Sequence, residues 1–194
     1  MGSTIEHVDD IVREKMSSLN GTAHSYAHVK RVFNIAVLLA TKEGANLELV
    51  KIGSLMHDLG RVIGSPHNET GAKLTREILK EMKYPSENSE KIAKIVLNHE
   101  IGAMPESLEE MIVWDADKLD LLGAVGIARV FHWAGATKET FEKAVKYCFE
   151  NMEPICDSMK TQTAKKMAEH EYEIVKIFLF ALEKELSSSL ESLE

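Results

Sequence analysis

The sequence has few cysteines, and it has no long apolar run. Its two cysteines, Cys148 and Cys156, cannot build a disulfide framework, which is typical of a reducing compartment and predicts a cytoplasmic protein. No apolar stretch reaches about 18 residues, so we expect no membrane-spanning helix. The first ten residues, MGSTIEHVDD, lack the basic and apolar regions of a secretory signal.

Positive charge is also scarce. Lysine and arginine number 23 against 31 aspartates and glutamates, which gives a formal net charge of −8. An acidic surface repels the phosphate backbone, so the composition argues against extended nucleic-acid binding and against docking on anionic membranes. The net charge places no limit on a local basic pocket.

The sequence does contain helical periodicity along most of its length. Its 194 residues are 44% hydrophobic and 28% charged, which suits one globular domain with one core. Apolar spacing predicts helices over 4–19, 25–43, 47–60, 66–83, 86–100, 106–122, 123–134, 138–152 and 160–186. We find no period-two alternation, no internal repeat and no flexible linker. The sequence therefore predicts a single all-α domain over residues 1–194.

Several of these helices carry a side chain of the metal-ligand type on an apolar face. Residues three, four or seven positions apart share one face of a helix. Four predicted helices each place one such residue there: His28, His67, His99 and Asp117. A lone histidine in that position is more often a hydrogen-bonded core residue than a ligand. A buried aspartate is rarer, because desolvating a carboxylate is costly unless it is paired or bound to metal.

A fifth predicted helix carries an adjacent pair, His57 and Asp58, near its end. Helical spacing puts Asp58 on the side of Ser54 and Lys51, where by itself it would be a solvated surface acid. Imidazoles and carboxylates without a thiolate are the donor set that suits Mn, Fe, Co, Ni, Zn or Mg. We therefore expect a divalent metal ion held by side chains from several helices.

Longer motifs resemble those of a known family. The order of His28, HDLG at 57–60 and Asp117 resembles the H…HD…D signature of the HD-domain metal-dependent phosphohydrolases. The run DADKLDLLGAVGIARVF at 115–131 resembles the DADRLDxxGAxGIAR segment of the small stand-alone HD hydrolases of bacteria and archaea. The stretch SYAHVKRV at 25–32 resembles the first-histidine helix of that group.

This resemblance implies a fold, a cofactor and a reaction. It covers about residues 20–135, which would form the core of an HD-type helical bundle, with C-terminal helices over about 138–186 packing on it. His67 and His99 match positions that bind a second metal ion in some HD branches and contact phosphate in others. The reaction would be hydrolysis of a phosphate ester or anhydride, with a small nucleotide as the expected substrate. The resemblance implies that one divalent metal ion is ligated by His28, His57, Asp58 and Asp117.

Three further residues are candidates for catalysis or substrate binding. Arg61 would hold a phosphate oxygen, or would only favour the end of a helix dipole. Asp120 would orient a ligand histidine or bind a sugar hydroxyl, and otherwise would pair with Lys118 or Arg129. Glu69 would act as a general acid or base, or would only favour the first turn of its helix.

Other functions stay open from the sequence. A non-catalytic helical module would use the metal ion for stability and bind a nucleotide as a regulatory ligand. A cyclic-nucleotide phosphodiesterase or a di-iron oxygenase would use related ligands. Trp133 would line a wall that stacks on a base or, in the more common pattern, pack in the core. The oligomeric state is open as well, with a homodimer as one alternative.

Overall fold

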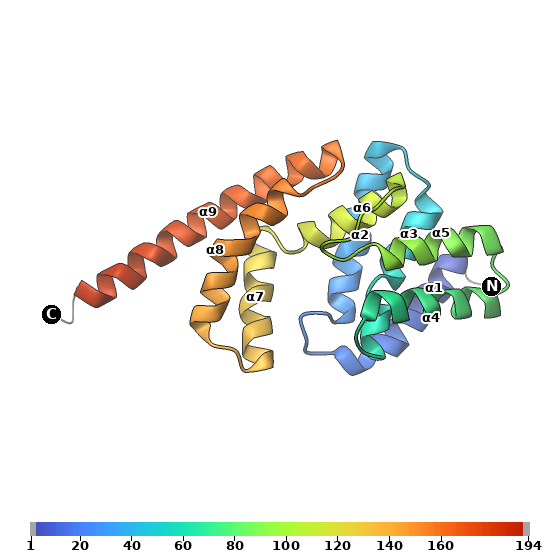
Figure 1. Cartoon of the computed structure of the whole chain (residues 1–194), viewed down its shortest axis with the longest axis horizontal. Helices are drawn as coiled ribbons and strands as arrows, with labels where there is room; N and C mark the ends of the chain where they lie inside the picture. Colours follow the sequence, from blue (N-terminus) through green and yellow to red (C-terminus); the bar gives the residue numbers. More distant parts are fainter. Residues whose placement is uncertain (1–2, 192–194) are drawn as a thin grey trace.

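The chain folds almost entirely into α-helices (Figure 1). The structure, a computed structural model, describes residues 3–191. Within that range the α-helices are α1 (Thr4–Lys15), α2 (Tyr26–Glu43), α3 (Leu47–Met56), α4 (His67–Glu81), α5 (Ser86–Leu97), α6 (Leu108–Leu119), α7 (Gly123–Thr137), α8 (Phe141–Asp157) and α9 (Gln162–Glu191). Two short 3₁₀ helices follow α1 and α3, namely η1 (Met16–Leu19) and η2 (Leu59–Val62). Residues 3–191 contain no strand, which confirms the all-α prediction.

Some helix boundaries differ from the expected ones, and two of them matter for the site. The α-helix expected over 47–60 already ends at Met56, and Asp58 lies in the turn before η2. α5 ends at Leu97, earlier than expected, so His99 lies beyond it. Helical spacing therefore does not describe the directions of Asp58 and His99.

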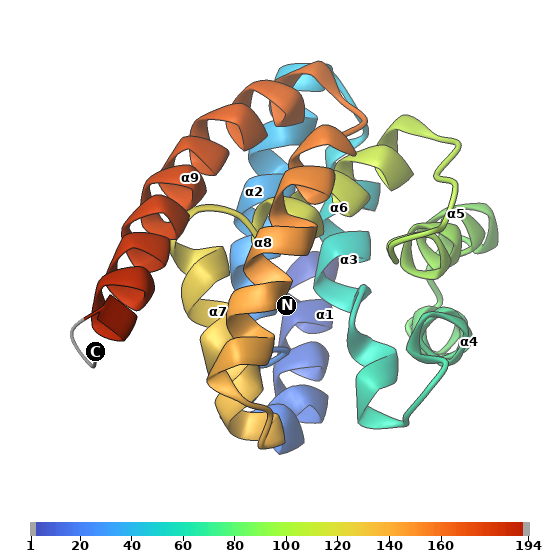
Figure 2. The same cartoon turned by 60° about the vertical axis from the view of Figure 1, so that its left-hand side comes forward.

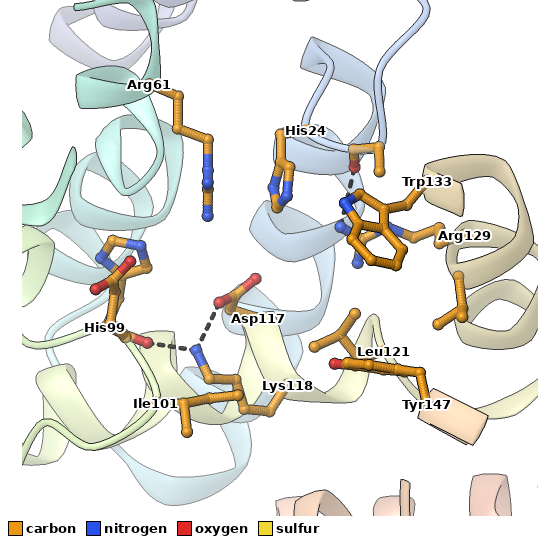
Figure 3. A pocket seen from close by; sticks show the side chains of 13 residues that line it. His24, Arg61, His99, Ile101, Asp117, Lys118, Leu121, Arg129, Trp133 and Tyr147 are labelled. Carbon is orange, nitrogen blue, oxygen red and sulfur yellow. Dashed lines mark hydrogen bonds and ion pairs between the residues drawn. The ribbon is translucent and has the colours of Figure 1, made fainter. Parts of the chain in front are cut away.

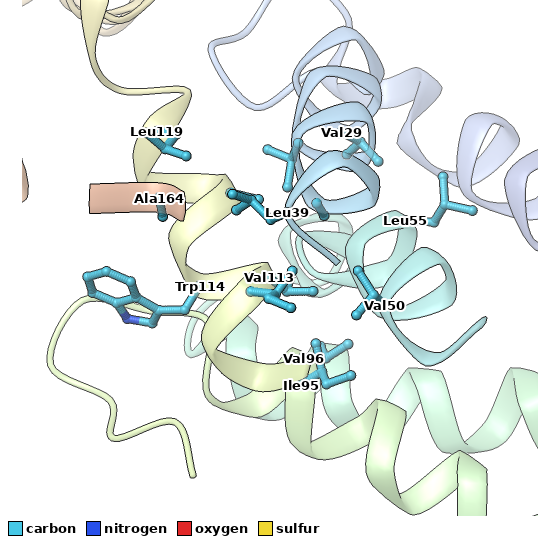
Figure 4. Close-up of a cluster of buried hydrophobic side chains, with 14 of the residues drawn as sticks. Val29, Leu39, Val50, Leu55, Ile95, Val96, Val113, Trp114, Leu119 and Ala164 are labelled. Atoms are coloured by element: carbon cyan, nitrogen blue, oxygen red, sulfur yellow. The ribbon is translucent and has the colours of Figure 1, made fainter. Parts of the chain in front are cut away.

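One hydrophobic core joins helices from both ends of the chain (Figure 4). Its buried members include Val29 and Leu39 of α2, Val50 and Leu55 of α3, Ile95 and Val96 of α5, and Val113 and Leu119 of α6. Ala164, near the start of α9, belongs to the same cluster. The last helix therefore shares one hydrophobic core with the first ones.

The central helices are flanked on two sides (Figures 1 and 2). α2 packs against α3 and α6, the pair α4 and α5 lies on one flank, and α7, α8 and α9 pack together on the other. None of the helices in the described part of the chain combines the length and the apolar composition needed to cross a membrane.

Candidate metal centre

Four predicted ligands meet among the central helices. His28 lies on α2, His57 and Asp58 follow α3, and Asp117 lies on α6. Nε2 of His28 is 3.3 Å from Nε2 of His57 and 3.3 Å from Oδ1 of Asp117. Ligand atoms of His28, His57 and Asp117 all lie within 4.8 Å of one another, so together they could hold a metal ion.

Asp58 faces two clusters of donor atoms with its two carboxylate oxygens. It is 1% exposed, so the surface position that helical spacing indicated for it is wrong. Its Oδ2 is 3.6 Å from Nε2 of His28 and 3.7 Å from Nε2 of His57. Its Oδ1 is 3.6 Å from Nε2 of both His67 and His99, and these three residues form a second group that could hold a metal ion. Asp58 therefore lies between the two groups.

Hydrogen bonds orient three of the histidines toward the cluster. Nδ1 of His57 and Nδ1 of His99 each donate to the backbone carbonyl three residues earlier, at 2.8 and 2.6 Å. Nδ1 of His28 donates to Oδ2 of Asp120 at 2.7 Å. Because these acceptors keep the proton on Nδ1, the neutral ring presents the lone pair of Nε2 to the cluster.

A buried histidine nitrogen at the centre lacks a hydrogen-bond partner. Nε2 of His99 is buried and has no hydrogen-bond partner among the described residues. A buried polar atom left unsatisfied is costly unless a ligand or an ion completes its bonding. Together with the nitrogen and oxygen donors around it, this atom shows that the residues present fit a divalent metal ion.

A close contact between η2 and α4 holds His67 beside Asp58. A Cβ atom on Gly60 would clash with backbone atoms of His67 and Gly71, so only glycine allows η2 to lie this close to α4. The HDLG string therefore joins two ligand-type residues to a glycine that the packing of α4 requires.

Asp120 connects His28 to two arginines. Its carboxylate accepts from Nε of Arg31 at 2.7 Å and lies 2.9 Å from Nη1 of Arg129. Arg129 also donates to the carbonyl of Ala23 at 3.0 Å. Burial alone would raise the pKa of Asp120, but hydrogen bonds from His28 and Arg31 and the charge of Arg129 lower it. Asp120 is thus an ionised carboxylate that orients His28, a candidate ligand.

The two candidate ligand carboxylates, Asp58 and Asp117, are also held in their ionised form. Burial alone would raise the pKa of Asp58, but its interactions with His57 and His24 hold it well below its usual range. Burial likewise opposes ionisation of Asp117, and the ammonium group of Lys118, 2.7 Å from Oδ2, outweighs that effect and lowers the pKa.

The two central histidines differ in pKa. Burial lowers the pKa of His28, but hydrogen bonds to Asp117 and Asp120 outweigh burial and raise it overall. Burial lowers the pKa of His57 to about 4, against the attraction of the Asp58 and Asp117 charges. The ring of His57 is therefore neutral at pH 7, whereas a proton on Nε2 of His28 would have to leave before that nitrogen could bind a metal ion.

We expect His57 to make the metal-free protein less stable in acid. Between the ordinary histidine pKa of about 6.5 and the folded value of about 4, the unfolded chain binds a proton that the folded chain does not, so the free energy of unfolding falls as the pH falls. From pH 7 to pH 5 this residue should contribute a loss of about 2 kcal/mol. Urea unfolding in chelator at both pH values measures the loss.

The control for this prediction is the exposed His170, whose side chain is 80% accessible. His57→Asn should remove most of the loss of about 2 kcal/mol in the free energy of unfolding between pH 7 and pH 5, and His170→Asn measures what the same substitution does at an exposed position. An unaltered pH dependence in the His57 variant would contradict the prediction.

A cavity of about 330 Å³ opens beside the ligand cluster (Figure 3). Its polar lining includes His24, Arg61, His99, Asp117, Lys118 and Arg129, and its apolar lining includes Leu121, Val130, Trp133 and Tyr147. The ring centroids of Trp133 and Tyr147 are 6.4 Å apart. A cavity of this size accommodates a small molecule, with charged groups on one side and aromatic rings on the other.

The three residues predicted to act in catalysis or substrate binding have different surroundings. Arg61 lines the cavity, and its Nε donates to Oδ1 of Asp58 at 2.6 Å. Asp120 is buried behind His28. Glu69 is exposed in the first turn of α4 and is not part of the cavity lining. The structure thus brings Arg61 and Asp120 to the site and leaves Glu69 outside it.

His24 and Lys118 are among the residues at the site that were not predicted as site residues. Nδ1 of His24 is 3.1 Å from Oδ2 of Asp58, and His24, His28 and Asp58 form a further group that could hold a metal ion. His24 lies in the loop before α2, where helical spacing carries no information. Lys118 is buried and donates to the backbone carbonyl of His99. The sequence feature that could have pointed to Lys118 is the presence of a lysine among the buried residues of α6.

A family model covers half of the chain. The model of the HD domain matches residues 25–122, which include His28, the HDLG turn and Asp117. This chain belongs to the HD-domain family. All of the candidate ligands in this HD domain, apart from His24, lie inside the matched segment.

Relatives of this HD domain extend over nearly the whole chain. YpgQ of Bacillus subtilis (strain 168) is 30% identical over 178 residues, or 85% of each protein. The crystal structure of Bacillus subtilis YpgQ in complex with ADP has a TM-score of 0.79 at 26% identity, over 94% of this chain and 97% of that one. An HD-superfamily hydrolase from Bacillus thuringiensis has a TM-score of 0.77 at 28% identity, over 94% of this chain and 96% of that one. The chain is thus similar to small HD proteins that include a hydrolase.

Proposed function

We propose that this HD domain is a divalent-metal-dependent phosphohydrolase that cleaves a phosphate ester or anhydride of a small nucleotide. The proposal rests on one observation. Four candidate ligands, His28, His57, Asp58 and Asp117, lie together beside a cavity that is also lined by basic side chains. Phosphoryl transfer depends mainly on positioning and on neutralisation of charge, and this arrangement offers both.

The proposed metal ligands are the same four residues, with His24, His67 and His99 next to them. A bound ion, whether Mn, Mg, Fe, Co, Ni or Zn, would activate water at neutral pH and polarise a phosphoryl oxygen. His67 and His99 share Oδ1 of Asp58, so they would either complete a site for a second ion or contact the phosphate.

Arg61 is the proposed phosphate-binding residue. Its guanidinium points into the cavity, while Asp58 holds its Nε at 2.6 Å (Figure 3). A guanidinium fixed in this way is preorganised to bind phosphate oxygens through its remaining N–H groups. Asp120 would act through His28 as a positioning residue, and Arg31 and Arg129 would keep it in place. Glu69 stays a predicted acid or base, without a place in this cavity.

The aromatic side of the cavity supports a nucleotide substrate. Trp133 and Tyr147 lie across the cavity from Arg61 (Figure 3), so a base could stack there while its phosphates reach the basic side. YpgQ, a relative of similar length, binds ADP in its crystal structure, which is consistent with this arrangement.

The test of the proposal is release of phosphate and pyrophosphate from a panel of nucleoside mono-, di- and triphosphates and cyclic nucleotides with Mn²⁺. We expect hydrolysis that a chelator abolishes and that Asp117→Ala reduces by at least about 100-fold. The product separates a monophosphatase, a pyrophosphohydrolase and a cyclic-nucleotide phosphodiesterase. No hydrolysis by folded, metal-loaded protein would contradict the proposal. Loss of helical circular dichroism on chelation would then favour the non-catalytic, metal-stabilised module.

Trp133→Ala should weaken nucleotide binding more than it slows the chemical step. Stacking of a base on an aromatic ring contributes about 1–3 kcal/mol, so we expect KM to rise about tenfold, with a smaller change in kcat. Steady-state kinetics on the best substrate of the panel measure both constants. Trp133→Phe keeps an aromatic face and should retain most of the affinity. Equal losses in the two variants would argue against stacking at this position.

A further inference from the structure

The outer face of α9 carries an apolar pair between two opposite charges. Glu173, Ile177, Phe180 and Lys184 follow one another at spacings of four, three and four residues, so they lie on one face of the helix, which we call the α9 stripe. All four are exposed, and Ile177 and Phe180 are each 70% exposed. The opposite face of the helix packs inward.

α9 lies at the edge of the molecule in both views (Figures 1 and 2). Its inner face contributes Val175 and Leu179 to the core, at 0% and 8% exposed. The apolar side chains of the α9 stripe therefore have no role in holding α9 to the rest of the domain. Single exposed apolar residues are common on proteins, so the exposure of Ile177 and Phe180 does not by itself indicate a contact surface. The order of charged and apolar residues along the stripe does.

The pattern is complementary to itself when the helix direction is reversed. If two α9 helices pair antiparallel with the two-fold axis between positions 178 and 179, each Glu173 faces Lys184 of the second copy. In the same arrangement each Ile177 faces Phe180 of the second copy. Closed two-fold dimers require a surface of this kind, in which residue i meets residue j and j meets i. A parallel pair would instead place Glu173 against Glu173 and Lys184 against Lys184, which is repulsive.

We propose that two copies of this chain associate through their α9 stripes, with the helices antiparallel. The apolar pairs form the centre of the contact and the two Glu173–Lys184 pairs its ends. Within one copy, Glu173 pairs with Lys176 on its own helix, where Nζ and Oε1 are 2.6 Å apart. Both groups are exposed, so this bond is weak and Glu173 can turn to the second copy at little cost. The proposal does not depend on the proposed hydrolase activity.

Sedimentation equilibrium of the full chain, from micromolar to a few hundred micromolar protein, tests the pairing. About 0.15 M salt limits the Debye length to about 8 Å, so the net charge of −8 on each copy does not dominate the result. We expect a monomer–dimer equilibrium. Glu173→Lys and Lys184→Glu should each weaken it by about tenfold or more, because each places like charges opposite each other.

The double variant Glu173→Lys with Lys184→Glu decides the orientation. Antiparallel pairing restores both charge pairs, so the double variant should dimerise nearly as well as the wild type. Ile177→Asp should abolish dimerisation. Phe149→Asp and Lys146→Glu on α8 are the matched controls, since Phe149 is also exposed, at 44%, and Lys146 is an exposed helix lysine. Both controls should dimerise like the wild type.

Circular dichroism verifies that each variant keeps its helices. A wild type that is monomeric over the whole concentration range would overturn the proposal. So would a dimer that survives Ile177→Asp, because its interface would then lie elsewhere. Failure of the double variant to recover association would overturn the antiparallel arrangement.

Discussion

Asp58→Asn should lower the proposed hydrolytic activity by a factor of about 10³ or more. Asp58 contributes oxygens to both groups of donor atoms and is the carboxylate that Arg61 contacts. Asparagine has nearly the same shape but no negative charge, so it cannot balance a divalent cation or hold the guanidinium as tightly. Measurements of kcat/KM with Mn²⁺ and of bound metal by mass spectrometry should both show the loss.

Asp115→Asn is the matched control for that experiment. Asp115 lies on α6 and is buried, as Asp58 is. Its carboxylate accepts hydrogen bonds from the backbone of Lys160 and Thr161, which precede α9 and lie away from the candidate ligands. Its variant should bind metal normally even if the protein becomes less stable. Wild-type metal content in Asp58→Asn, or equal losses of bound metal in the two variants, would show that Asp58 is not a ligand.

Asp120→Ala should have the largest effect on stability, a loss of about 3 kcal/mol in the free energy of unfolding. Asp120 is buried and balances Arg129, which is buried with it, so its removal leaves a guanidinium without its carboxylate. His28 also loses the acceptor at 2.7 Å that orients its ring, and metal affinity should fall by about 10- to 100-fold. Urea unfolding and metal titration measure the two effects separately.

Glu90→Ala provides the comparison for Asp120→Ala. Glu90 also pairs with an arginine, Arg76, at 2.8 Å, but both side chains are largely exposed. Such a pair contributes less than about 1 kcal/mol, so this variant should unfold almost like the wild type. If Asp120→Ala were equally mild, the buried network would not be what holds α2, α6 and α7 together.

The fold was largely predictable because helical periodicity records which face of each helix is buried. His28 and Asp117 lie within helices, so their spacing from apolar neighbours predicted their inward direction, and the structure brings them together. Asp58 was different. The periodic pattern assumed a helix through residue 60, but α3 ends at Met56 and the turn redirects Asp58 inward. Only the resemblance to the HD signature predicted that Asp58 is a ligand.

The remaining site residues were not predictable from local pattern, because long-range contacts decide them. His24 sits in a loop and meets Asp58, which is 34 positions away. Trp133 was expected more in the core than in a wall for the base, and it both packs against the core and lines the cavity beside Tyr147 of the next helix. The packing of α7 against α8 decides which partly apolar face of each helix borders the cavity. The periodicity within one helix does not contain that information.

The residues around the cavity lie on both sides of the point in the chain where the match to the HD-domain model ends. The matched HD segment ends at residue 122, whereas Val130, Trp133 and Tyr147 come after it. The HD-domain model by itself therefore covers the candidate ligands and does not reach the surface that would contact a base. Two members of the family with identical ligands can differ in α7 and α8, and their substrates have to be assigned one protein at a time.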